Sequence, residues 1–145
     1  MTPKEMAVES FCDGFLCSQS ILLAHCEKYG MEKEIALKLG AGFGGGMGRM
    51  GNTCGTVTGS IAVIGLEHGA TSAEDNVSKE ETYQAVRKFV TIFKERYGSL
   101  ICKELLGCDI SNPEEYEYAR EKELFENLCP KLVSGAVEIL EEVLK

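Results

Sequence analysis

Apolar side chains recur along this chain at steps of three and four residues, which is the spacing of one face of an α-helix. The two-residue alternation that is typical of strands is missing. The first apolar stripe predicts one helix that ends at Gly30, because glycine is a common residue just past a helix. The residues that fall near this face are Ala7, Phe11, Phe15, Ser18, Leu22 and Tyr29. A short second helix is predicted over residues 33–39.

Five further helices are predicted from later stripes, and several of them carry boundary signals. They span residues 53–69, 78–98, 99–107, 112–128 and 130–144. Asn52 or Thr53 can cap the first of these helices, and the Ser78–Glu81 pair has the form of a capping box for the second. The Asn112–Pro113 pair is a strong start signal, and Pro130 is expected to open the last helix.

Together these elements predict an all-α fold: one domain over residues 1–145, built as a compact bundle of about six to seven helices with a glycine-rich crossover loop. The formal net charge is −8 and no cluster of Lys and Arg occurs, which argues against nucleic acid or an anionic membrane as a partner. No run of 18 apolar residues occurs, and the amino-terminal segment lacks the apolar core of a signal peptide. A cytoplasmic location is therefore expected.

Glycine is concentrated in one part of the chain. Eleven of the sixteen glycines fall between Gly40 and Gly69, so this segment has a role that bulkier residues would obstruct. Between residues 36 and 66 the only charged side chains are Lys38 and Arg49, both positive. Backbone amides in such a segment can closely approach a negatively charged group. The alternative is that the glycines only permit a tight crossover between packed helices.

Cysteine is the second unusual feature of the composition. The seven cysteines are Cys12, Cys17, Cys26, Cys54, Cys102, Cys108 and Cys129. Structural disulfides are not expected in a reducing compartment, and burial as a small apolar side chain is the ordinary role, which fits Cys12 and Cys26. Cys54, Cys102 and Cys129, however, are predicted at the amino ends of helices. Helix amides and the helix dipole favour a thiolate there, so a lowered thiol pKa is predicted for these three.

Five segments carry a resemblance to a known family. They are Gly14–Ser20, Gly42–Gly48, Cys54–Gly59, Cys102–Gly107 and Cys129–Lys131. In this order the chain resembles the redox-active proteins named for a pattern of four cysteines, one of them within a Cys-Gly-Ala-x-x-Gly motif. Thr56 stands where the family usually has alanine. The chain is also similar to the iron–sulfur domain of split-Soret cytochromes, where widely spaced cysteines hold a two-iron cluster.

The resemblance implies that the family's four cysteines are Cys17, Cys54, Cys102 and Cys129. Of these, Cys17 is added by the resemblance alone, because the apolar pattern places it on a helix face. Members are described as redox proteins without an assigned reaction. No catalytic residue is predicted, since the two histidines lie far apart and the carboxylates fall on exposed helix faces.

The leading hypothesis is an electron-transfer or redox-sensing module whose four cysteines bind an iron–sulfur cluster, [2Fe–2S] in type, and not a stand-alone catalyst. The first alternative is a metal-free module in which Cys54 forms a disulfide with Cys17 or Cys102. A structural zinc site is the next, although such sites usually draw on cysteine pairs two to four residues apart. A helical interaction domain with buried cysteines is the last. A redox partner protein is expected under the leading hypothesis, and a homodimer is left open.

Overall fold

The computed structural model describes residues 1–145 and confirms the predicted all-α bundle, with eight α-helices and two short 3-10 helices. The α-helices are α1 (Pro3–Cys12), α2 (Cys17–His25), α3 (Lys33–Gly40), α4 (Gly55–His68), α5 (Asn76–Tyr97), α6 (Cys102–Leu106), α7 (Pro113–Glu121) and α8 (Leu124–Val143). The 3-10 helices η1 (Cys26–Tyr29) and η2 (Ala41–Phe43) extend α2 and α3. None of the helices combines the length and the apolar character needed to cross a membrane.

The number of helices exceeds the predicted six to seven because the predicted first helix is two. Gly14 has a φ of 109°, which ends the helical path after α1. Phe15 lies in the connection and is 40% exposed, so it is not part of a buried stripe. The second helix then begins at Cys17. As a result this cysteine occupies a helix start and not the middle of a helix face.

The boundary between α7 and α8 also differs from the prediction. The predicted helix over 112–128 ends at Glu121, and Glu123 has a left-handed φ of 54°. The last helix begins at Leu124, so Pro130 lies inside it and does not open it. Cys129 therefore lies in the second turn of α8, and the prediction that it stands at a helix amino end is wrong.

Several predicted boundary signals act as expected, and two are displaced. Asn112 caps α7 by accepting hydrogen bonds from the amides of Glu114 and Glu115 at 2.9 and 3.2 Å. Gly30, Gly98 and Gly107 end their helices in the left-handed conformation. The helix predicted from Ser78 instead starts at Asn76, because the Asp75 carboxylate accepts the amide of Ser78. The helix predicted from Asn52 or Thr53 starts at Gly55, with Cys54 as its N-cap.

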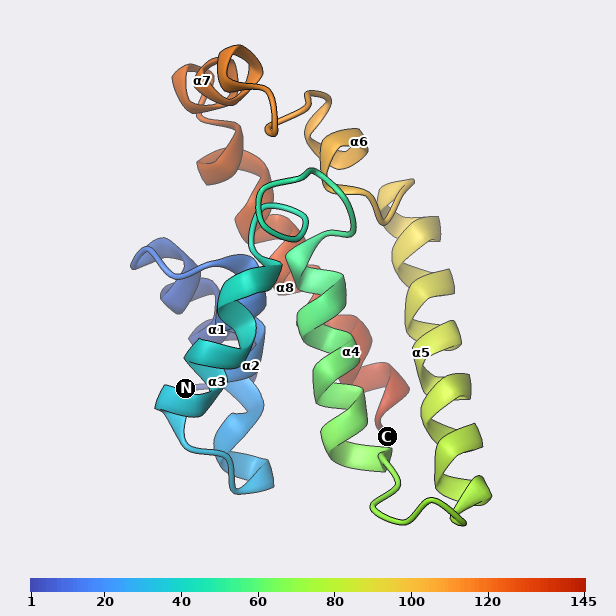
Figure 1. Ribbon diagram of the computed structural model, residues 1–145. Helices are drawn as coiled ribbons and strands as arrows, with labels where there is room; N and C mark the ends of the chain where they lie inside the picture. The colour runs from blue at the N-terminus through green and yellow to red at the C-terminus, as the bar shows by residue number, and fades with distance from the viewer.

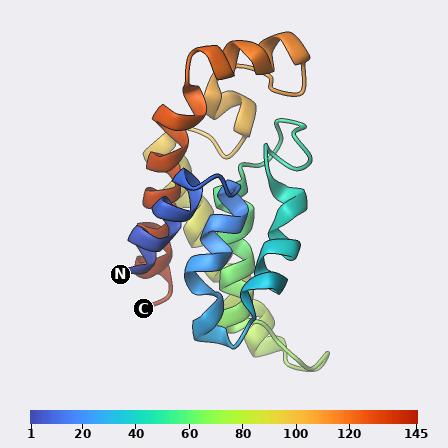
Figure 2. The same ribbon diagram turned by 90° about the vertical axis from the view of Figure 1, so that its left-hand side faces the viewer.

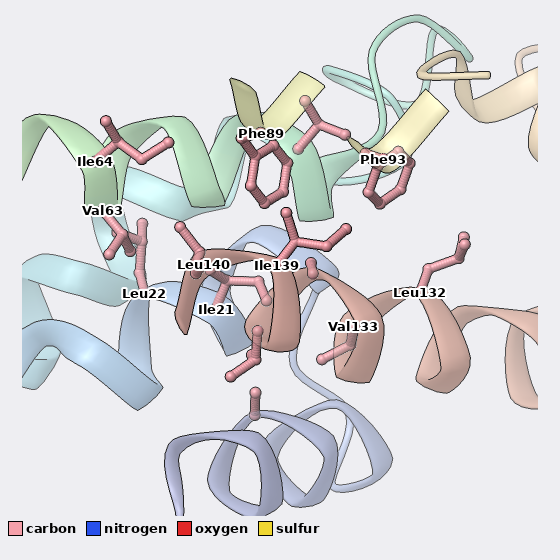
Figure 3. Close-up of a cluster of buried hydrophobic side chains, with 14 of the residues drawn as sticks. Ile21, Leu22, Val63, Ile64, Phe89, Phe93, Leu132, Val133, Ile139 and Leu140 are labelled. Carbon is pink, nitrogen blue, oxygen red and sulfur yellow. The ribbon is translucent and has the colours of Figure 1, made fainter. Parts of the chain in front are cut away.

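The main core lies where α2, α4, α5 and α8 meet (Figure 3). Each helix contributes branched or aromatic side chains, and the largest that are fully buried are Ile21, Ile64, Phe89, Phe93, Leu132, Ile139 and Leu140. The Phe89 and Phe93 rings are stacked with centroids 6.0 Å apart. The glycine loop is the segment 44–54 between η2 and α4. At one end of the bundle, α6, α7 and this loop extend beyond the packed core helices, and the α4–α5 turn lies at the other end (Figures 1 and 2).

Two glycines on one face of α4 let this helix approach α2 closely. A Cβ atom at Gly59 would lie 3.0 Å from the carbonyl oxygen of Ser18 and 3.2 Å from the Cβ of Ile21. A Cβ at Gly55 would lie 3.1 Å from the amide of Ser18. The spacing Gly55-x-x-x-Gly59 therefore brings the amino ends of α2 and α4 together.

We expect Gly59→Ala to lower the free energy of unfolding by about 1–2 kcal/mol, because overpacking against the backbone of α2 outweighs the better helix propensity of alanine. Gly65 is the matched control, since it lies in the same helix and a Cβ there meets nothing within 4 Å. Gly65→Ala should raise the free energy by roughly 0.5–1 kcal/mol. Urea denaturation of the two variants measures both values. Equal stabilisation by both changes would contradict the close α2–α4 contact.

His25 is buried at the end of α2, where its Nδ1 lies 2.8 Å from the carbonyl oxygen of Ile21. Burial lowers the pKa of its imidazole below the usual 6.5. The imidazole pKa is about 6.5 in the unfolded chain and lower in the folded chain. At a pH between these two values the unfolded chain binds more protons than the folded one, so the free energy of unfolding falls as the pH drops below about 6.5. The slope from this group is at most about 1.4 kcal/mol per pH unit. His25→Gln should remove that slope when denaturation curves at pH 5 to 7.5 are compared with the unchanged chain.

Candidate functional site

The glycine loop contains five consecutive residues in the left-handed conformation. Gly45, Gly46, Met47, Gly48 and Arg49 have φ values of 65°, 74°, 65°, 58° and 60°. The turn is held by its own backbone: the amide of Gly48 donates to Gly42 at 2.9 Å, and that of Arg49 donates to Gly44 at 3.1 Å. This conformation costs a non-glycine residue about 1–2 kcal/mol, so two of the five positions are strained.

The end of this loop is fixed to the segment before α6 by a short antiparallel contact. Thr53 and Ile101 form an isolated bridge. The amide of Cys54 donates to Leu100 at 2.8 Å, and the amide of Cys102 donates to Asn52 at 2.6 Å. These two hydrogen bonds join the residues on either side of the bridge. Cys54 and Cys102, which are 48 positions apart in the sequence, are thereby brought together.

The other two cysteines of the predicted set come from α2 and α8. Cys17 is the first residue of α2, and its Cβ lies 3.3 Å from the position that a Cβ would take at Gly55. Cys129 reaches the same place from the second turn of α8, and its thiol is close enough to that of Cys17 for each to shift the pKa of the other. Cys17 therefore lies between the start of α4 and the side of α8.

All four cysteines line one cavity of about 1100 Å³. Cys54, Cys102 and Cys129 are 5%, 9% and 7% exposed, and Cys17 is half-buried. A second, smaller core packs around Cys102 and Cys129, with Leu106, Ile110 and Ala119 among its buried residues. No three His, Cys, Asp or Glu side chains form a group that could hold a metal ion in this arrangement.

The remaining three cysteines are placed differently. Cys12 is exposed and also lines the cavity. Cys26 is fully buried in the main core, where its thiol donates to the carbonyl of Leu23 at 3.5 Å. Cys108 is buried in the second core and does not line the cavity. Cys12 is thus the only member of this group within the cavity.

The predicted lowering of the thiol pKa by helix amino ends is wrong for two of the three cysteines. Burial raises the pKa of Cys54 above its ordinary value, although hydrogen bonds from Thr56 oppose the rise. Burial and the neighbouring Cys54 raise the pKa of Cys102 to about 12. Removal from water disfavours a thiolate more than a short helix end favours it.

Cys129 is the exception, and the cause is another thiol. The hydrogen bond from Cys17 lowers the pKa of Cys129, because the Cys17 S–H can donate to the Cys129 thiolate. The same bond and burial raise the pKa of Cys17. The first proton of this pair therefore leaves Cys129, and the second is held tightly.

Two polar contacts at the cavity were not predicted from the sequence. The Thr56 hydroxyl, fully buried, lies 3.1 Å from the sulfur of Cys54. The Arg49 guanidinium lies over the Tyr116 ring, with its central carbon 4.2 Å from the ring centroid. Tyr116 lies in an acidic helix whose sequence indicates only a solvated face. Its position over the loop depends on how α7 packs, which no local pattern encodes.

The comparisons with known proteins agree with the cysteine pattern. A family model described as "Putative redox-active protein (C_GCAxxG_C_C)" matches residues 15–143. This range includes the four predicted site residues Cys17, Cys54, Cys102 and Cys129. The curated proteins and the solved structures gave no match to the chain.

Proposed function

The chain belongs to the C_GCAxxG_C_C family of redox-active proteins, and we propose that Cys17, Cys54, Cys102 and Cys129 bind an iron–sulfur cluster of the [2Fe–2S] type. The observation that carries this proposal is that four thiols from four distant segments line one cavity, with three of the four cysteines buried. Four cysteine thiolates are the usual ligand set of such a cluster. The bound cluster would supply one-electron transfer or redox sensing.

No three of the thiols are grouped closely enough to hold a single metal ion, but their surroundings fit an anionic group with sulfur ligands. Gly44, Gly45 and Gly46 line the cavity without side chains, so the backbone of the loop can lie close to the ligands. Arg49 brings a positive charge to the same cavity in a protein of net charge −8. Backbone amides and a cation near a thiolate-ligated cluster offset its negative charge.

Purification without oxygen tests the proposal directly. We expect a brown protein with visible charge-transfer absorption and with iron and acid-labile sulfide in near-equal amounts. Metal analysis of the same sample distinguishes iron from zinc. A colourless protein that stays free of iron after reconstitution with ferrous iron and sulfide would overturn the cluster, and stoichiometric zinc would favour a structural metal site instead.

A metal-free thiol–disulfide module is the second candidate, and the contact between Cys17 and Cys129 favours it. In this reaction the two thiols form one S–S bond and give two electrons and two protons to a disulfide of a partner protein, which becomes a dithiol. The contact pair differs from the predicted pairs of Cys54 with Cys17 or Cys102. Redox titration of iron-free protein should then show one two-electron step that Cys129→Ser removes and Cys54→Ser retains.

Thr56 offers a prediction on the loaded protein. A deprotonated Cys54 cannot donate a hydrogen bond, so the Thr56 hydroxyl at 3.1 Å must be the donor. A donor to a ligand sulfur favours the reduced, more negative cluster. Thr56→Ala should therefore lower the reduction potential by an amount on the order of tens of millivolts, while Thr56→Ser keeps the hydroxyl and the potential. A potentiometric titration followed by electron paramagnetic resonance measures the shift.

A further inference from the structure

The cavity that holds the four thiols extends well beyond them. Its volume of about 1100 Å³ slightly exceeds the range of about 300–1000 Å³ that is usual for small-molecule sites. Away from the cysteines its walls are apolar and partly aromatic, with Phe11, Tyr116 and Phe125 among the lining residues. Phe15 and Leu16 also line it while 40% and 38% exposed. A cavity of this kind suits an organic molecule with an aromatic body.

The charge in this cavity is carried by two side chains, Arg49 and Glu126. The guanidinium of Arg49 is over the face of Tyr116 and takes part in none of the five ion pairs of the protein. Arginine is suited to bidentate pairing with a carboxylate, sulfonate or phosphate group. Arg49 is itself exposed to solvent, and no carboxylate of the chain pairs with it directly.

The backbone at Arg49 is strained. This residue has a left-handed φ of 60°, a conformation in which glycine would be unstrained. Glycine occupies three of the five left-handed positions here, yet an arginine is kept at a position that faces the cavity. Met47 has the same conformation but does not line the cavity, so what distinguishes Arg49 is its unpaired charge at the cavity wall.

We propose that this cavity binds an organic anion with an aromatic body, whose anionic group pairs with the Arg49 guanidinium and whose rings lie against Phe15, Leu16 and Tyr116. The inference goes beyond the proposed function, because such binding does not require a cluster. It also gives the protein a ligand in the same cavity as its thiols.

Titration of the full chain with anthraquinone-2-sulfonate, a planar aromatic with one negative charge, tests the site by isothermal calorimetry. Arg49→Gly should weaken binding by roughly ten- to hundredfold, which corresponds to the loss of one charge-assisted hydrogen-bonded pair. Met47→Gly is the matched control, because Met47 has the same left-handed conformation, with a φ of 65°, but does not line the cavity. It should change the dissociation constant by less than about twofold.

Three results would overturn the site: equal affinities of Arg49→Gly and Met47→Gly, equal affinities for the sulfonate and the neutral 2-(hydroxymethyl)anthraquinone, or no binding at all.

The titration is repeated on iron-free protein kept reduced, which separates this inference from the proposed function. If the cluster proposal fails, binding that depends on Arg49 still supports the site. Binding that needs iron would contradict it. Thermal melting of each variant checks that it is folded.

Discussion

Serine in place of Cys54 is expected to give a protein that contains iron only at background level after anaerobic reconstitution. The serine hydroxyl has nearly the size of the thiol but is a poor ligand for an iron–sulfur cluster, which selects soft thiolates. The same result is expected for Cys17→Ser, Cys102→Ser and Cys129→Ser, because the four thiols share one cavity. The measurement is iron and sulfide content together with the visible spectrum.

Cys12 is the matched control for these four substitutions. It lines the same cavity but is exposed and is not one of the four cysteines of the family pattern. Cys12→Ser should retain the iron content and spectrum of the unchanged chain. A second control, Cys108→Ser, changes a buried thiol that does not line the cavity. The assignment is contradicted if Cys12→Ser loses iron or if any of the four cavity variants keeps it in full.

The same set of variants separates the two proposed redox functions. In a thiol–disulfide module only the contact pair Cys17 and Cys129 is required. Loss of redox behaviour in all four variants therefore favours the cluster. Loss confined to Cys17→Ser and Cys129→Ser favours the disulfide.

The parts of the fold that follow local rules were predictable from the sequence. Asn112 before Pro113 fixes the start of α7, and Gly98 fixes the end of α5, because each meets a local backbone requirement. The apolar run in α4 was assigned correctly as helix. By contrast, Glu123 adopts a left-handed conformation without any sequence signal, so the sequence predicts neither the break between α7 and α8 nor the position of Pro130 inside the last helix.

The candidate site was predictable only in part, because its chemistry depends on tertiary contacts. The resemblance selected the four cysteines, and the apolar pattern alone would have left Cys17 on a helix face. The local argument for lowered pKa values at Cys54 and Cys102 could not include burial, which acts in the opposite direction. The pairing of Cys17 with Cys129 joins α2 to α8, and no spacing in the sequence encodes it.

Gly46 is the loop position at which a substitution should have the largest effect on the site. A Cβ atom there would lie 2.6 Å from the amide nitrogen of Asn52 and 2.8 Å from the Cβ of Cys102. Both neighbours belong to the antiparallel contact that joins the loop to α6, so neither can move alone. The φ of 74° adds the cost of a left-handed conformation. Gly46→Ala should therefore lower the free energy of unfolding by about 2–4 kcal/mol.

Gly48→Ala separates packing from backbone strain. Gly48 has a similar φ of 58°, but a Cβ there meets nothing within 4 Å. Its replacement should lower the free energy of unfolding by only about 1–2 kcal/mol and leave iron content unchanged. Gly46→Ala, in contrast, should also reduce iron content, because Cys102 must shift away from Cys54 to make room. Chemical denaturation and iron analysis of the two variants measure these effects. Equal losses of stability and of iron in both variants would mean that the loop backbone does not set the position of Cys102.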